Sequence, residues 1–261
     1  MSASCLVVEN DPTSPLGHLA EWLGDGGLAL DVVRAHAGQP LPADLSGRAA
    51  FVVLGGAQAA YPGPDGAPAS PWFPALEALL RAAVRDRVPT LGVCLGAQVL
   101  ATAHHGTVEP AAFGPEIGPG LVAKRDAAEA DPLFGPVPML PDVIQWHHDE
   151  ITELPLGAVL LAASPGCPVQ AFRLGSAAWG VQFHLEVEYA TFAAWVADGG
   201  DVLAGAGLDG DELLARVAGL SDDLFEVWHP VATRFAALAR GELAPFLDTP
   251  VSGRRLPLIG P

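Results

Sequence analysis

The first hundred residues alternate short apolar runs typical of β-strands with amphipathic runs typical of helices. Strand-like runs are expected at 5–9, 29–33, 50–54 and 90–93, with a first helix at 16–23. Between the last two strands, apolar residues from Leu76 to Val84 follow helical spacing, which predicts a crossover helix ending before Pro89. Strands joined through helices run parallel. The sequence therefore predicts an α/β fold with a doubly wound, mostly parallel sheet, whose ligands bind beyond the carboxyl ends of the strands.

The second half of the chain changes character twice. Residues 106–141 are rich in glycine and proline, which favours turns and short antiparallel strands, and strand-like runs return at 158–162, 169–174 and 178–183. Past Tyr189 the pattern is helical, with one apolar stripe that we interpret as core packing: Leu224, Val227, Trp228, Val231, Phe235 and Leu238. We expect one domain over residues 1–195 and a helical C-terminal extension, residues 196–261, packed on it.

Composition excludes some classes of binding partner and indicates where in the cell the protein is expected. The net charge is -17, with 13 basic against 30 acidic residues, so a nucleic acid would be repelled. No apolar stretch approaches the roughly 20 residues of a membrane helix. The start of the chain lacks the basic region and long apolar segment of a signal peptide. We expect a cytoplasmic protein that binds neither nucleic acid nor membrane.

A candidate nucleophile lies at the end of the strand-like run 90–93. Gly92, Cys94 and Gly96 form a G-x-C-x-G pattern between this run and a helical run that we expect to continue to His105, with Gly106 as its cap. Glycines are favoured two residues before and after a nucleophile at a tight strand-to-helix turn, because larger side chains would clash there. The helix start favours the thiolate form of the cysteine. The alternative, a buried and inert thiol, is the usual state of a free cysteine.

The other two cysteines lack such a setting. Cys5 falls in the first strand-like run and Cys167 in a Pro-Gly turn, so both are expected to be structural. An odd number of cysteines with no C-x-x-C spacing argues against a disulfide framework and a zinc knuckle.

A candidate base follows the strand-like run 178–183. His184 and Glu186 are two residues apart, so in extended backbone both side chains point the same way. A thiolate needs a base and a group that orients the base, and this pair provides both. An H-x-E pair alone is weak evidence, since a lone histidine near an apolar strand is more often a core residue. It gains weight beside the Cys94 turn.

At these two segments the chain resembles class I glutamine amidotransferases, the family with a Cys-His-Glu triad, and in particular the stand-alone members described as GMP-synthase-like. The resemblance rests on Val93–Gln98 and Val181–Val187 and spans roughly residues 6–189. It implies a flavodoxin-like fold and a catalytic triad of Cys94, His184 and Glu186.

The resemblance also implies an oxyanion hole and substrate contacts. The segment around Gly55 and Gly56 resembles the family's S-G-G-P loop, which gives the backbone amide of Gly56 as one oxyanion donor. The other donor would be the amide of Leu95, the residue after the nucleophile. Gly55 and Gln98 would contact substrate. The segment beginning at Trp146 resembles S-H-G-D and adds three further substrate contacts, His147, His148 and Asp149.

Three departures from the family pattern stand out. Leu185 replaces the usual proline between histidine and glutamate, and Leu54 and Ala57 replace serine and proline in a loop that acts through its backbone. His148 replaces a glycine and places a side chain near the α-carbon end of the substrate. It could change which γ-glutamyl compound is accepted.

The resemblance implies a glutaminase that cleaves a γ-glutamyl amide through a thioester on Cys94 and passes ammonia to a separate partner synthase. One alternative is a γ-glutamyl hydrolase acting on a conjugate. A metal-binding protein is another, with ligands drawn from five histidines: His104, His105, His147, His148 and His184. A catalytically silent binding module is a fourth. The chain has no Walker A motif or pyrophosphatase loop, and we expect no cofactor and no metal.

Overall fold

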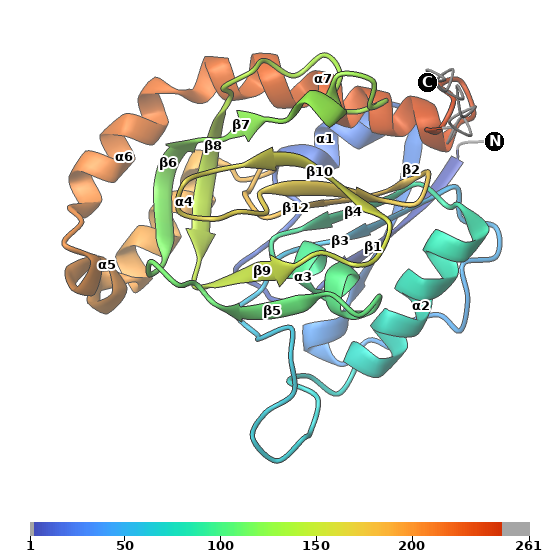
Figure 1. Cartoon of the computed structure of the whole chain (residues 1–261), viewed down its shortest axis with the longest axis horizontal. Helices are drawn as coiled ribbons and strands as arrows, with labels where there is room; N and C mark the ends of the chain where they lie inside the picture. Colours follow the sequence, from blue (N-terminus) through green and yellow to red (C-terminus); the bar gives the residue numbers. More distant parts are fainter. Residues whose placement is uncertain (1–2, 247–261) are drawn as a thin grey trace, which may run out of the picture.

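The computed structural model describes residues 3–246, and residues 247–261 of the expected C-terminal extension lie outside the described residues. Its centre is an eight-stranded sheet with the order β2-β1-β3-β4-β12-β11-β10-β7 (Figure 1). The strands are β1 (Ala3–Glu9), β2 (Leu28–Arg34), β3 (Ala50–Val53), β4 (Thr90–Val93), β7 (Ala123–Lys124), β10 (Ala158–Ala163), β11 (Ala171–Leu174) and β12 (Ala178–Val181). The predicted strands lie within two residues of these bounds.

The sheet combines a parallel and an antiparallel half. Strands β2, β1, β3, β4 and β12 pair in parallel, whereas β11, β10 and β7 continue the sheet in antiparallel pairing. The prediction of a mostly parallel sheet covered by helices is confirmed. In β4 and β12, Val93 pairs with Val181 at the carboxyl ends, so the segments that follow these two strands emerge side by side.

Helices cover both faces of the sheet, as the alternation of β1 requires. Cys5 and Val7 point into the core beneath α1 (His18–Asp25) and α7 (Ser221–Ala239). Leu6 and Val8 point into the opposite core, beneath α2 (Phe73–Asp86) and α3 (Leu95–Thr102). Successive side chains of a strand point to opposite faces, and all four are fully buried. Short 3-10 turns occur at Ala35–Ala37 and Asp126–Ala128.

The glycine-rich middle of the chain forms two antiparallel ribbons, as predicted. The first pairs β5 (Thr107–Pro110) with β9 (Asp149–Glu153), and the second pairs β6 (Glu116–Leu121) with β8 (Asp142–His147). The second ribbon is tied to the main sheet by the backbone N–H of His184, which donates to the carbonyl of Ile144 at 2.8 Å. The segment between β8 and β9 therefore lies close to the end of β12.

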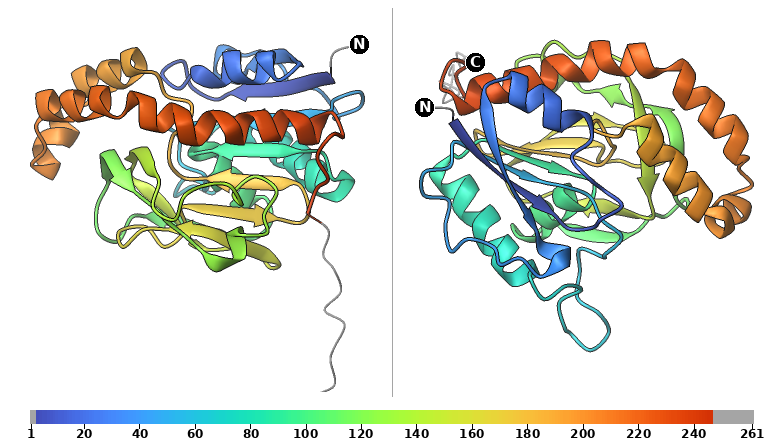
Figure 2. Two further views of the ribbon diagram at one scale, coloured as in Figure 1. Left: turned by 90° about the horizontal axis from the view of Figure 1, so that it is seen from above. Right: turned by 180° about the vertical axis from the view of Figure 1, so that it is seen from behind.

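Of the C-terminal helices, α7 packs on one face of the sheet, and the preceding helices lie beside the second ribbon (Figure 2). The C-terminal helices are α4 (Tyr189–Asp198), α5 (Gly200–Ala206), α6 (Gly210–Gly219) and α7. The predicted apolar stripe does pack in the core: Trp228 and Phe235 are fully buried, and Leu224 and Val227 are partly buried against the same cluster. Helix α7 therefore shares one core with α1 and the sheet, and the division into residues 1–195 and 196–261 stays a prediction. No helix among residues 3–246 is long and apolar enough to cross a membrane.

One helix end differs from the prediction. The helix after Cys94 ends at Thr102, and the left-handed residue that closes it is His105, with φ of 67°, rather than Gly106. The N–H of Gly106 returns to the carbonyl of Ala101 at 2.8 Å. The sequence predicts that the helix ends at Gly106, because glycine adopts positive φ most easily, but in the structure His105 takes this conformation.

Candidate active site

Cys94 occupies a strained turn between β4 and α3. Its φ of 51° and ψ of -110° are unusual for a residue with a side chain. A Cβ atom on Gly92 would lie 2.6 Å from the carbonyl oxygen of Gly96, and one on Gly96 would lie 2.1 Å from the carbonyl oxygen of Val53. Both distances are far below contact, so only glycine fits at these two positions. The turn presents Cys94 at the start of α3.

His184 and Glu186 form a buried pair immediately after β12. The imidazole Nδ1 lies 2.7 Å from Oε1 of Glu186, and both side chains are almost fully buried. Burial alone would lower the pKa of His184. The charges of Glu186 and Cys94, with hydrogen bonds to both, outweigh burial and raise this pKa to about 10. The raised pKa favours the imidazolium form of His184, which is placed between a carboxylate and the Cys94 sulfur.

The loop that carries Glu186 is fixed against the start of α1. The N–H of His18 donates to the carbonyl of Glu186 at 2.8 Å. Gly17 has φ of 48°, and a Cβ atom there would lie 2.1 Å from the same carbonyl oxygen. A larger residue at position 17 would displace the loop that holds the carboxylate on His184.

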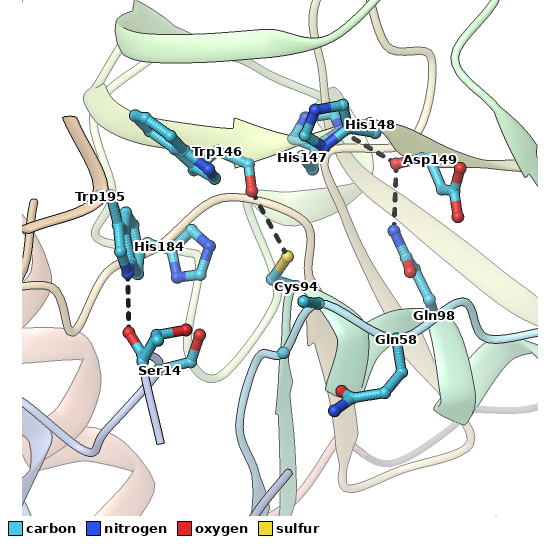
Figure 3. Close-up of a pocket in the computed structure, with 13 residues that line it drawn as sticks. Ser14, Gln58, Cys94, Gln98, Trp146, His147, His148, Asp149, His184 and Trp195 are labelled. Atoms are coloured by element: carbon cyan, nitrogen blue, oxygen red, sulfur yellow. Dashed lines mark hydrogen bonds between the residues drawn. The ribbon is translucent and has the colours of Figure 1, made fainter. Parts of the chain in front are cut away.

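A cavity of about 240 Å³ opens in front of Cys94 (Figure 3). Seven of the predicted site residues line it: Gly56, Cys94, Gln98, His147, His148, Asp149 and His184. The other three do not line the cavity and lie next to residues that do. Glu186 is behind His184, Leu95 follows the nucleophile, and Gly55 packs on the His184 ring, since a Cβ atom there would lie 3.2 Å from Cε1.

The two predicted oxyanion donors are neighbours. A Cβ atom on Gly56 would lie 2.9 Å from Cδ2 of Leu95, so the loop after β3 and the start of α3 are in direct contact. Leu95 is the first residue of α3, where backbone N–H groups have no partner within the helix. This position suits a developing negative charge on a carbonyl oxygen beside Cys94.

A hydrogen-bonded network holds the far wall of the cavity. The side-chain amide of Gln98 donates to the carbonyl of Asp149 at 3.0 Å and to Oε1 of Gln182 at 3.1 Å. The Asp149 carbonyl also accepts a hydrogen bond from Nδ1 of His147 at 3.0 Å, and the opposite ring nitrogen lies 3.0 Å from Oε2 of Glu116. Burial would raise the pKa of Glu116, but the bond and charge of His147, with further hydrogen bonds, hold it below its usual range.

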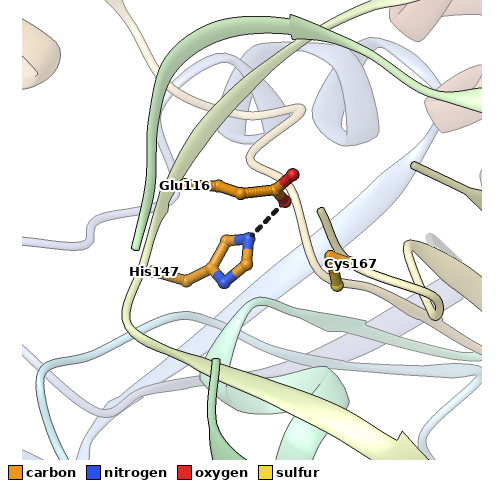
Figure 4. Close-up of side chains that lie close together, drawn as sticks. All are labelled: Glu116, His147 and Cys167. Atoms are coloured by element: carbon orange, nitrogen blue, oxygen red, sulfur yellow. Dashed lines mark hydrogen bonds and ion pairs between the residues drawn. The ribbon is translucent and has the colours of Figure 1, made fainter. Parts of the chain in front are cut away.

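Glu116 and His147 also meet Cys167, away from the Cys94 turn (Figure 4). Within residues 3–246 this is the one group of three metal-ligating side chains, with ligand atoms within 4.8 Å of one another. The Glu116 oxygens already accept hydrogen bonds from Ser164 and Gln170 as well as His147, so both carboxylate oxygens have partners within the protein. The five histidines considered as ligands form no such group in the described part of the chain.

Several cavity residues were not predicted from the sequence. Thr13, Ser14, Gln58 and Trp195 line the cavity, and Trp195 comes from α4, with its indole N–H donating to the carbonyl of Thr13 at 2.7 Å. The Trp195 ring lies edge-on to His184, with centroids 4.8 Å apart. No local pattern predicts contacts between segments so far apart in the chain.

The family profile for class-I glutamine amidotransferases matches residues 46–199 of the chain, more than half of its 261 residues. The chain belongs to the class-I glutamine amidotransferase family. Within this family it is 39% identical over 113 residues to one subunit of the glutamine-hydrolysing GMP synthase of Thermococcus kodakarensis, a match that covers 41% of the chain and 55% of that relative. The chain thus spans about half the length of this relative.

Two further relatives match over longer segments. The chain is 30% identical to a putative glutamine amidotransferase-like protein of Salmonella typhimurium, over 65% of the chain and 70% of the relative. It is 29% identical to "Gamma-glutamyl peptidase 3" of Arabidopsis thaliana, over 62% of the chain and 65% of the relative. Among solved structures, a glutamine amidotransferase from Thermotoga maritima superposes with a TM-score of 0.79 at 25% identity, covering 90% of this chain and 99% of that chain.

Proposed function

We propose that this amidotransferase hydrolyses a γ-glutamyl amide through a glutamyl thioester on Cys94. The observation that carries the proposal is the strained Cys94 turn, which opens into a cavity against a histidine that is itself paired with a buried carboxylate. Nucleophile, base and orienting group come from three sequence positions, 94, 184 and 186, which follow two neighbouring strands. This is the arrangement that acyl transfer requires.

The first half of the reaction forms the thioester. The Cys94 thiolate attacks the γ-carbonyl carbon and a C–S bond forms, while the oxygen takes the negative charge opposite the N–H groups of Gly56 and Leu95. His184, protonated in the resting site, gives its proton to the leaving nitrogen. The C–N bond then breaks and ammonia or an amine departs.

The second half releases glutamate. Water attacks the thioester carbon, and His184, now neutral, takes a proton from it. The C–S bond breaks with its electron pair returning to sulfur, which regenerates the thiolate and the imidazolium. Glu186 stabilises the imidazolium and holds the ring in place, since its carboxylate accepts from Nδ1 throughout.

For the leaving group, we propose ammonia delivered to a separate synthase. One relative is itself part of a synthase. The chain has one lysine, Lys124, and its ammonium is buried in bonds to Glu129 and to the carbonyls of Gly135 and Val137. This lysine is not free to bind the phosphates of an acceptor substrate.

A second candidate is a γ-glutamyl conjugate with an organic amine as leaving group. His148 is exposed on the cavity and stands where the family has glycine, and the indole rings of Trp146 and Trp195 form an apolar wall beside His184. One relative is named a γ-glutamyl peptidase.

The test of the proposed function is a mass-spectrometric screen of purified protein against glutamine and a set of γ-glutamyl conjugates. Release of glutamate from glutamine, faster than from any conjugate, supports the glutaminase. Faster cleavage of one conjugate supports the second candidate. No glutamate release from any compound in the set, in the presence of correctly folded protein, would contradict both.

A further inference from the structure

Gln182 is a buried side chain whose amide faces the nucleophile. It follows β12, two residues before His184, and is 1% exposed. Its Nε2 lies 3.7 Å from Sγ of Cys94, within hydrogen-bonding distance for sulfur. The cavity is lined by other residues, so Gln182 approaches the sulfur from within the protein rather than from the substrate side.

The surrounding network fixes which end of the Gln182 amide faces the sulfur. The Asp149 carbonyl can only accept, so the Gln98 atom 3.0 Å away is its NH₂ group. The same NH₂ group lies 3.1 Å from one end of the Gln182 amide, and that end must therefore be the oxygen. The Gln182 NH₂ group is left pointing at Cys94.

The carbonyl that orients Gln98 is held in place by further hydrogen bonds. The Asp149 carbonyl is held by Nδ1 of His147, and the opposite ring nitrogen of His147 bonds to Glu116 (Figure 4). Glu116 in turn accepts from the Gln170 side chain at 2.6 Å. A chain of hydrogen bonds thus runs from the second ribbon to the nucleophile, and its two bonds nearest Cys94, Gln98 to Gln182 and Gln182 to the sulfur, are buried.

We propose that Gln182 donates a hydrogen bond to the Cys94 thiolate and that Gln98, through its own bond to the Asp149 carbonyl, holds Gln182 in that orientation. This rests on the proposed role of Cys94 as nucleophile. A thiolate accepts a stronger hydrogen bond than a thiol, so the donor favours the resting anion. It also stabilises sulfur when the C–S bond of the thioester breaks and the electron pair returns to it.

The experiment measures the rate of Cys94 alkylation by iodoacetamide across pH, together with hydrolysis of the best substrate, in the full chain. Gln182→Met keeps the length of the side chain but removes the donor. We expect the midpoint of its alkylation profile to move up by about one pH unit and its hydrolysis at neutral pH to fall about tenfold.

Gln145→Met is the matched control, because Gln145 is also buried, at 4% exposed, but lies in β8 and does not line the cavity. Its profile should coincide with wild type.

Gln182→Glu provides the second variant and applies even where Gln182→Met does not fold. It keeps the acceptor for Gln98 but places a carboxylate beside the sulfur, so its midpoint should rise at least as far. A wild-type profile in either folded Gln182 variant overturns the proposal. Failure of the proposed function looks different: wild-type protein would then release no glutamate, whatever the alkylation profiles show.

Discussion

Residues 3–246 contain two groups of cysteine, histidine and glutamate whose surroundings differ. Cys94 with His184 and Glu186 lies at the carboxyl ends of β4 and β12, and Cys167 with His147 and Glu116 lies beside the second ribbon. All of these cysteines and histidines are buried. Residue types alone do not separate the two groups.

Local geometry and charge do separate them. The Cys94 sulfur faces a histidine whose pKa is raised to about 10 and lines a cavity. Cys167 is fully buried, and its pKa is raised by burial and by the charges of Glu116 and Glu150. Its thiol donates to the carbonyl of Val169 at 3.5 Å. A reactive cysteine therefore needs a cation nearby and access, whereas a carboxylate beside the sulfur keeps it protonated.

The largest expected effect comes from removing each sulfur in turn. Cys94→Ala should lower kcat for γ-glutamyl hydrolysis by at least about three orders of magnitude, because Cys94 supplies the one thiol on this cavity among residues 3–246. Cys167→Ala should keep activity within a few-fold of wild type. Both should remain folded by circular dichroism. Equal losses in the two variants would remove the distinction between the groups.

The orienting glutamates give the next comparison. Glu186→Gln should reduce kcat by about 10²-fold or more, because the neutral amide stabilises the His184 imidazolium less well. Glu116→Gln acts on His147, which supports the cavity wall, and should reduce it by less than about tenfold. Steady-state kinetics on the same substrate would show the order. A greater loss in Glu116→Gln would mean that the second group has the catalytic role.

The smallest effect concerns pH and stability. His184 has a raised pKa in the folded protein, so its stabilising contribution is complete below its unfolded value of about 6.5 and is lost as pH rises towards about 10. Denaturant unfolding of wild type should therefore show a free energy that falls between pH 7 and 10. The fall should be shallower in Glu186→Gln, where the charge that raises the pKa is absent. Parallel curves for the two proteins would contradict the assigned ion pair.

Much of the fold could be predicted from the sequence, because it depends on patterns within short segments. The β4–Cys94–α3 turn requires glycines at fixed offsets, and the β1 alternation reflects two buried faces. The same holds for His184 and Glu186, which share one short segment. Gln182 lies in the same segment, two residues before His184. In extended backbone their side chains point the same way, and this spacing could have identified Gln182 as a site residue.

The rest of the site depends on long-range packing. Trp195 reaches Thr13 across 182 positions of sequence, and Glu116 meets His147 only because β6 pairs with β8. No periodicity within one segment encodes these contacts. His105 closes α3 in a left-handed conformation that glycine, the next residue, adopts more easily, so this local preference did not locate the end of the helix.

The most direct test of Cys94 as the nucleophile is covalent labelling with a diazoketone analogue of glutamine, followed by peptide mass spectrometry. We expect a single adduct on the peptide containing Cys94, with Cys5 and Cys167 unmodified, and protection by an excess of the preferred γ-glutamyl substrate. An adduct on Cys167 or Cys5, or none on Cys94 in protein that turns over the substrate, would contradict this role of Cys94.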